Sequence, residues 1–273
     1  MGQVVSASDA PASTAPRLQL RSESGWRQGL ANLLRKEGSL WWGTRLGWVQ
    51  ALIWLGILNG MLFIPLYFMS AEFAAQGIEP LEAAIDMFFT FAAIAPPIGA
   101  IILMQGAVIT EKQLGTAAWI LSKPASRSAF VLAKLVAFGV GLLIAAFLLP
   151  GTVAYSMLSL QGGAPLPLAP FVAALGIVAL HALFYLTLAL MLGTFFNSRG
   201  PVLAVPLALL FGGDFVVGFW PALGEIMPWV LGRLAVLTLQ GLPWPSTLPL
   251  LSTLVWAVAF VWAAIWRFRR EEF

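Results

Sequence analysis

Residues 131–158 read VLAKLVAFGVGLLIAAFLLPGTVAYSML, an apolar run that contains one charged side chain, Lys134. A helix needs about 20 mostly apolar residues to cross a bilayer, and this run is longer than that. Of the 273 residues in the chain, 60% are hydrophobic and 10% are charged. An average soluble domain carries roughly 25% charged residues. The composition therefore predicts an all-α, polytopic membrane protein.

Five other runs have a similar length and character, so six transmembrane helices are expected within a single transmembrane domain, residues 26–273. The predicted spans cover residues 46–69, 84–109, 131–158, 168–194, 201–220 and 247–267. A further apolar stretch, residues 225–240, has Pro228 near its start and Arg233 at its centre. We expect this stretch to form short re-entrant helices between the fifth and sixth spans.

The basic residues support the count of six. With six spans, 14 of the 15 Lys and Arg residues face one side, and Arg233 alone faces the other. Basic loops usually remain in the cytoplasm, which predicts a multi-pass protein of the cell (plasma) membrane with cytoplasmic N- and C-termini. A seventh span would place the basic C-terminal end on the opposite side.

Acidic residues gather in the first outer loop instead. Glu79, Glu82 and Asp86 share one face of a predicted helix, an arrangement that also suits a cation site. A solvated face beside the membrane is the interpretation that we favour.

The N-terminal part differs from the rest of the chain. Residues 1–25 are rich in Ser, Ala and Pro and lack an apolar run, so a disordered cytoplasmic tail is expected rather than a signal peptide. From Trp26 to Trp42, apolar residues recur at helical spacing between basic ones. This pattern predicts an amphipathic helix at the membrane interface, with its tryptophans among the lipid head groups.

Several classes of site are disfavoured by composition. The chain has no cysteine and one histidine, so we expect neither a disulfide framework nor a metal centre. The net charge of +3 is explained by the topology, and no nucleic-acid partner is expected. No phosphate-binding loop occurs, so the chain is not expected to be an ATP-hydrolysing enzyme.

The segment between the second and third predicted spans, residues 110–130, has a mixed composition. From Glu111 to Leu135 it reads EKQLGTAAWILSKPASRSAFVLAKL. Leu114, Ala117 and Leu121 predict a short helix that ends before Pro124, and Ser126 is placed to cap the next helix. The result is a helix-turn-helix elbow on the cytoplasmic side. A basic loop lying on the membrane surface is the alternative.

This segment resembles the permease subunits of type-2 ABC transporters, most of which are exporters. The resemblance rests on Glu111, Gly115-Thr116, Leu121-Ser122, Pro124, Ser126-Arg127 and Lys134. Lys123, which stands between the serine and the proline, departs mildly from the family pattern. The predicted topology, with its amphipathic first helix and its broken helices before the last span, is also similar to that family.

The resemblance implies that residues 110–130 are a coupling elbow seated on a separate ATP-binding subunit. That subunit would bind ATP and Mg, and this chain would hold no cofactor. We expect Glu111, Lys112 and Arg127 to make charged contacts with the ATPase. Gly115 would permit close approach and, with Thr116, open the short helix. Trp119 would pack inside the elbow, and Pro124 would form its turn.

Four of the polar residues inside the predicted spans are candidates for a functional role. They are Asn59, Gln105, His181 and Asp214. Polar groups inside a membrane are costly, so a place on the translocation path is the functional hypothesis and hydrogen bonding within the bundle is the structural one. Pro96 and Pro97 are expected to break and kink the second span near its middle.

Three functions compete at this stage. The first is an export permease that forms its pathway as a homodimer or heterodimer, with an amphiphilic substrate favoured by the scarcity of charge in the spans. The second is a non-transporting anchoring or assembly protein that docks a cytoplasmic partner. The third, a membrane-embedded enzyme, lacks the convergent acid, base or histidine groups that catalysis needs.

Overall fold

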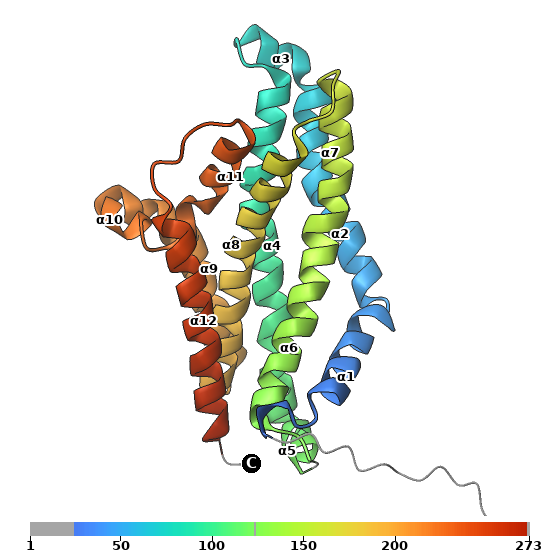
Figure 1. Cartoon of the computed structure of the whole chain (residues 1–273), viewed down its shortest axis with the longest axis vertical. Coiled ribbons are helices and arrows are strands. Elements are labelled where there is room, and N and C mark those ends of the chain that lie inside the picture. The colour runs from blue at the N-terminus through green and yellow to red at the C-terminus, as the bar shows by residue number, and fades with distance from the viewer. Residues whose placement is uncertain (1–24, 123, 272–273) are drawn as a thin grey trace, which may run out of the picture.

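The described residues of the computed structural model form an elongated helical bundle (Figure 1). The structure describes residues 25–271 except 123, and the side chains of residues 118, 121 and 214 also lie outside the description. The predicted tail, residues 1–25, therefore falls almost wholly outside the described residues. The predicted all-α class is confirmed for the described part of the chain, which contains no strand.

Five helical segments are long and apolar enough to cross a membrane. They are Leu46–Phe68, α4 (Pro80–Gln113), Arg127–Gln161, α8 (Leu168–Phe195) and α12 (Leu248–Arg269). The first segment consists of α2 (Leu46–Phe63) and the π-turn Ile64–Phe68. The third consists of α6 (Arg127–Leu142), the π-turn Leu143–Leu148 and α7 (Leu149–Gln161). These five match predicted spans. The other predicted span, 201–220, is a helix, α9 (Arg199–Phe219), whose apolar part Arg199–Gly213 is shorter than the other five.

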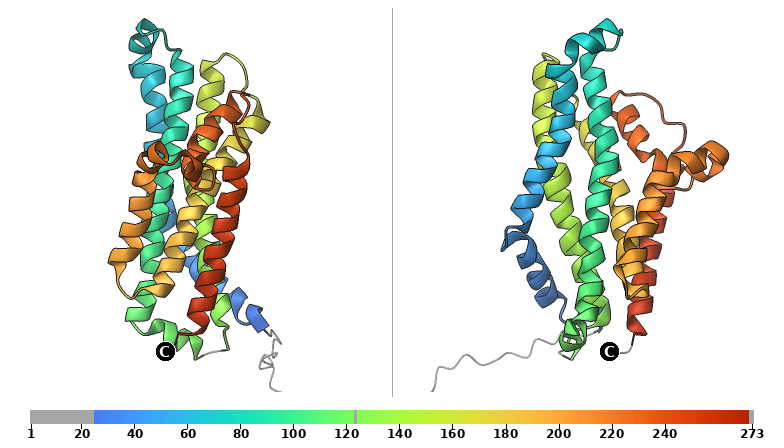
Figure 2. Two further views of the ribbon diagram at one scale, coloured as in Figure 1. Left: turned by 90° about the vertical axis from the view of Figure 1, so that its left-hand side faces the viewer. Right: turned by 180° about the vertical axis from the view of Figure 1, so that it is seen from behind.

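The bundle has two ends. The short helix α5 (Thr116–Leu121), the start of α1 (Leu30–Trp42) and the end of α12 lie together at one end, which we call the α5 end (Figures 1 and 2). The short helix α3 (Ser70–Ala75) marks the opposite end, the α3 end. Both ends of the described chain therefore lie at the α5 end.

The predicted break at Pro96 and Pro97 is wrong, whereas the kink expected there stays a prediction. Helix α4 continues through both residues for 34 residues, or about 51 Å at 1.5 Å per residue. Both prolines are buried. A single helix thus joins the two ends of the bundle.

Helix α1 packs on the bundle through one face. Leu33, Glu37 and Trp41 recur every four residues and are buried. The ring of Trp41 meets Phe138 edge-on at 5.8 Å between centroids and lies over Gly141, where a side chain would collide with it. Trp41 is therefore a core residue and not the head-group anchor predicted for it, whereas Trp26 and Trp42 are about half-exposed.

The segment between α9 and α12 folds into short pieces between the middle of the bundle and the α3 end (Figure 2). They are α10 (Pro221–Gly224), the 3-10 turn Pro228–Val230 and α11 (Leu231–Leu239). Two glycines let this segment approach its neighbours. A Cβ at Gly232 would lie 2.8 Å from Ala93 of α4, and one at Gly213 would collide with the Trp229 ring. The Trp229 indole also donates to the Leu209 carbonyl at 2.8 Å.

Candidate functional site

The elbow at the α5 end begins where α4 stops at Gln113. Gly115 has a φ of +68°, in the left-handed region that favours glycine, and α5 follows at once. Ser126 then caps α6, because its side chain accepts a hydrogen bond from the Ala129 amide at 2.9 Å. Thr116 donates back to the Glu111 carbonyl at 3.2 Å. These local interactions account for the helix-turn-helix shape.

The turn after α5 is held by the segment that precedes α1. Ser126 donates through its hydroxyl to the Trp26 carbonyl at 2.6 Å and through its amide to the Gln28 carbonyl at 2.9 Å. Gly29, with a φ of +76°, approaches the Pro124 carbonyl and Ala125 so closely that a Cβ would lie 2.9 Å from the Ala125 Cβ. The position of Pro124 is thus set by contacts from a distant part of the chain.

The outer surface of the elbow is apolar. Leu114 is 71% exposed and Trp119 is 62% exposed, whereas Ala117 and Ile120 face inward. Trp119 therefore does not pack inside the elbow as predicted. The elbow presents a large aromatic and an aliphatic side chain outward at the end of the bundle where the basic residues gather.

A cluster of four charged residues joins the elbow to two other helices. Glu111, the last acidic residue of α4, lies 2.6 Å from the Lys36 ammonium and 3.1 Å from that of Lys134. Glu37 lies 3.1 Å from Lys134 and 3.2 Å from Lys36. We call these four residues, from α1, α4 and α6, the ion cluster. Its charges balance, two positive and two negative.

Burial makes the ion cluster sensitive to change. The side chain of Lys134 is 2% exposed, whereas that of Lys36 is 48% exposed. Burial alone would lower the pKa of Lys36, but the hydrogen bond to Glu111 and the attraction of both carboxylates outweigh it, and the pKa is raised above 10.5. Lys36 is therefore a cation at neutral pH. Removing one partner of a buried pair leaves an unpaired charge, which is the costly change.

A second set of contacts ties the elbow to the ends of α8, α9 and α12. Lys112 lies 2.7 Å from Glu271 and donates to the Thr194 carbonyl at 3.4 Å. Arg199 donates to the Thr110 hydroxyl at 3.1 Å, and Arg127 donates to the Arg269 carbonyl at 2.6 Å. The end of α4 is thus connected to the last turn of α8, the first residue of α9 and the residue Glu271 just after α12.

These contacts change the interpretation of the predicted charged residues. Glu111, Lys112 and Arg127 all have partners within the chain. Any contact that they make with an ATPase would therefore be made by side chains already held by ion pairs or hydrogen bonds within the permease. Sequence reasoning missed Lys36, Glu37 and Glu271. The four-residue spacing of Leu33, Glu37 and Trp41 on an otherwise apolar face was the one available signal for Glu37.

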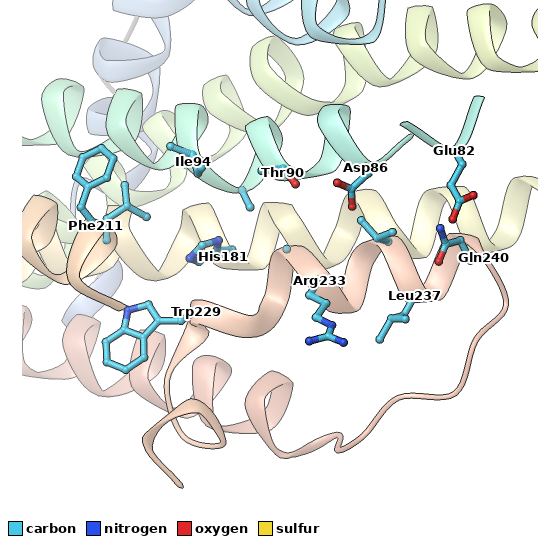
Figure 3. Close-up of a pocket in the computed structure, with 14 residues that line it drawn as sticks. Glu82, Asp86, Thr90, Ile94, His181, Phe211, Trp229, Arg233, Leu237 and Gln240 are labelled. Carbon is cyan, nitrogen blue, oxygen red and sulfur yellow. The ribbon is translucent and has the colours of Figure 1, made fainter. Parts of the chain in front are cut away.

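Of the four polar residues of the predicted translocation path, the three whose side chains are described do not line a common pocket. His181 lines a pocket of about 520 Å³ between α4, α8, α9 and α11 (Figure 3), and neither Asn59 nor Gln105 does. Both side-chain atoms of Asn59 and the Gln105 side-chain oxygen are buried and unpartnered among the described residues. Asp214 lies in α9, and its side chain is outside the described part of the structure.

The family model described as ABC-2 family transporter protein matches residues 66–273. The chain belongs to the ABC-2 transporter family. The match includes the elbow and all long helices after α2. No curated protein matches the chain. As an ABC-2 membrane domain, this chain is a permease component of an ABC transporter, a system that implies an ATP-binding partner.

Proposed function

We propose that this ABC-2 chain is the permease of an ATP-driven exporter in the cell membrane and that the elbow, residues 110–130, transmits the movement of a separate ATPase subunit. The observation that carries this proposal is that the elbow has exposed apolar side chains on its outer surface and ion pairs to other helices of the same chain at its base. Leu114 and Trp119 offer a contact surface, and the ion cluster connects that surface to α1 and α6.

The bracing suits force transmission. A push on α5 reaches α4 through the single turn at Gly115 and then reaches α8 and α12 through Lys112. A loop that merely lay on the membrane surface would need no such connections. ATP and Mg would be bound by the partner subunit, and the residues of this chain would supply the mechanical link.

The topology completes the proposal. With α9 crossing the membrane as a sixth span, the α5 end faces the cytoplasm and carries both termini. The short helices around α11 then lie in the outer half of the membrane. Two copies of the permease, identical or paired with a related chain, would enclose a pathway for an amphiphilic substrate.

Co-purification tests the proposal directly. The full chain is expressed with the P-loop ATPase encoded by a neighbouring gene, extracted in mild detergent and isolated through a tag on the permease. A stable complex whose ATPase activity depends on the permease is expected. If no neighbouring ATPase binds the monodisperse chain, the exporter proposal fails.

A further inference from the structure

The pocket near the α3 end is a built site with a polar end and an apolar end. Glu82 and Asp86 of α4 lie at one end, and the rings of Phe211 and Trp229 lie at the other, with His181 between them (Figure 3). Helices α4 and α11 supply most of its wall. The contacts of Gly232 with Ala93 and of Gly213 with Trp229 fix the position of that wall.

His181 is the observation that points to a ligand. It is 3% exposed, and neither ring nitrogen has a hydrogen-bond partner among the described residues. Buried polar groups are normally paired, because an unpaired one costs desolvation energy with nothing gained. A neutral imidazole offers one donor and one acceptor, so the side chain is equipped to bind a polar group that enters the pocket.

The charges of the pocket select the head group. Glu82, Asp86 and Thr90 recur every four residues along one exposed face of α4 and all line the pocket. No described cation lies within ion-pair distance of either carboxylate. Arg233 lines the same pocket from α11, but its guanidinium points away from the two carboxylates (Figure 3). An ammonium group fits this end better than an anion.

The depth of the pocket selects an amphiphile. Asp86 lies 25 residues before Glu111 in α4, about 37 Å along the helix, so with the α5 end at one membrane surface Asp86 reaches the other. His181 lies 13 residues before Thr194, about 20 Å from the α5 end, and so inside the hydrocarbon layer. The pocket thus extends from head-group level toward the membrane interior.

We infer that this pocket binds an amine-bearing amphiphile, with its ammonium group against Glu82 and Asp86. The apolar body lies along Ile94, Phe211 and Trp229, and a hydrogen-bonding group behind the amine pairs with His181. Under the proposed permease function, this is a substrate site facing the outer membrane surface. The pocket volume suits a ligand of drug-like or single-chain lipid size.

The absence of cysteine from the chain permits a protection assay. Thr90→Cys places a thiol between the carboxylates and His181, and Gln76→Cys places one on the exposed loop after α3, outside the pocket. Each full-length variant, in nanodiscs of phosphatidylcholine, is alkylated by a small maleimide. The probes are dodecyltrimethylammonium and dodecyl sulfate, which share a chain length and differ in head-group charge, both below their micellar concentrations.

We expect dodecyltrimethylammonium to slow alkylation of Thr90→Cys by about tenfold or more at saturation, and dodecyl sulfate to have little effect. Neither probe should protect Gln76→Cys. Adding Glu82→Gln and Asp86→Asn should abolish the protection, and each single change should weaken it. Glu72→Gln, an exposed carboxylate of α3 outside the pocket, is the matched control and should leave protection unchanged.

Equal protection by the two probes, or protection that survives removal of both carboxylates, overturns the inference. The Gln76→Cys rate and a monodisperse elution profile check that each variant is folded. His181→Phe tests the second contact with an amphiphile that has a hydroxyl behind its amine, and only that probe should lose protection. The assay uses neither ATP nor an ATPase, so its failure removes the ligand site and leaves the permease proposal to the co-purification test.

Discussion

The buried ammonium group of Lys134 forms ion pairs with the carboxylates of Glu37 and Glu111. Lys134→Met keeps much of the side-chain volume and leaves Glu37 and Glu111 with one ammonium, that of Lys36. The substitution removes the ammonium from a buried ion pair and leaves a carboxylate charge without its partner. We therefore expect the free energy of unfolding to fall by about 3–5 kcal/mol. Reversible unfolding in mixed micelles measures the change.

The more exposed Lys36 supplies the comparison for that prediction. Lys36→Met should cost clearly less, because water replaces part of what is lost. Adding Glu37→Gln to Lys134→Met should cost less than the sum of the two single changes, since it removes the charge left unpaired. Strict additivity of the two changes would show that the ion cluster is not a coupled unit.

The exposed apolar tip of the elbow leads to a different prediction. Leu114→Ser should weaken binding of the partner ATPase by about tenfold, because a leucine covered by a partner contributes on the order of 1.5–3 kcal/mol. The stability of the isolated permease should not change. Leu160→Ser, at a leucine that is 80% exposed near the α3 end, is the control and should leave ATPase binding unaffected. Binding is measured by titrating the ATPase against the permease in nanodiscs.

At the scale of the helix, two adjacent glycines of α9 form a matched pair. Gly213→Ala would drive a methyl group into the Trp229 ring, whereas Gly212→Ala meets nothing within 4 Å. Both changes favour the helix by up to about 1 kcal/mol, so the difference between them reports the collision. We expect Gly213→Ala to be less stable than Gly212→Ala by about 1–3 kcal/mol.

Thermal unfolding of the two variants in the same detergent measures this difference. A shift of Trp229 should also weaken its hydrogen bond to the Leu209 carbonyl and disturb the α11 wall of the pocket. Equal stability of the two variants would mean that α9 and the 3-10 turn at Pro228–Val230 are not packed as tightly as the structure has them.

Helix positions were predictable from sequence, but the partners of individual side chains were not. Apolar runs placed five long helices within a few residues, because length and hydropathy are local properties. Pro96 and Pro97 misled, since the local rule for proline omits the packing that keeps α4 continuous. Trp41 was expected at the membrane surface and is buried, whereas Trp119 was expected to be packed and is exposed. The reason is the same, because whether a tryptophan is buried depends on which helix lies opposite.

The whole molecule raises the question of whether α9 crosses the membrane. Single cysteines in the cysteine-free chain answer it in intact cells with a membrane-impermeant maleimide. Ala222→Cys, after α9, should react from outside, and Ser198→Cys, before α9, should react only after the cells are opened. Gln76→Cys and Ser122→Cys mark the outer and inner sides. Reaction of Ala222→Cys and Ser198→Cys on the same side would contradict six spans.

The candidate site was predicted only in part from the sequence. The elbow was found because its turn residues are neighbours in the chain. The ion cluster joins positions 36, 37, 111 and 134, and the pocket joins α4, α8, α9 and α11, so each depends on helix arrangement. The shared face of Glu82 and Asp86 was visible in the sequence, but their separation from Arg233 and their nearness to His181 were not.

The four residues of the ion cluster are synthesised in a fixed order. Lys134 is the last of its four members to be synthesised, because residues 36, 37 and 111 all precede it. When the third long helix leaves the ribosome, its ammonium therefore meets carboxylates that have already reached the membrane. In the reverse order, Lys134 would enter first and would have no carboxylate partner until Glu111 followed. The charges of the ion cluster are thus balanced as soon as the helix that carries Lys134 is inserted.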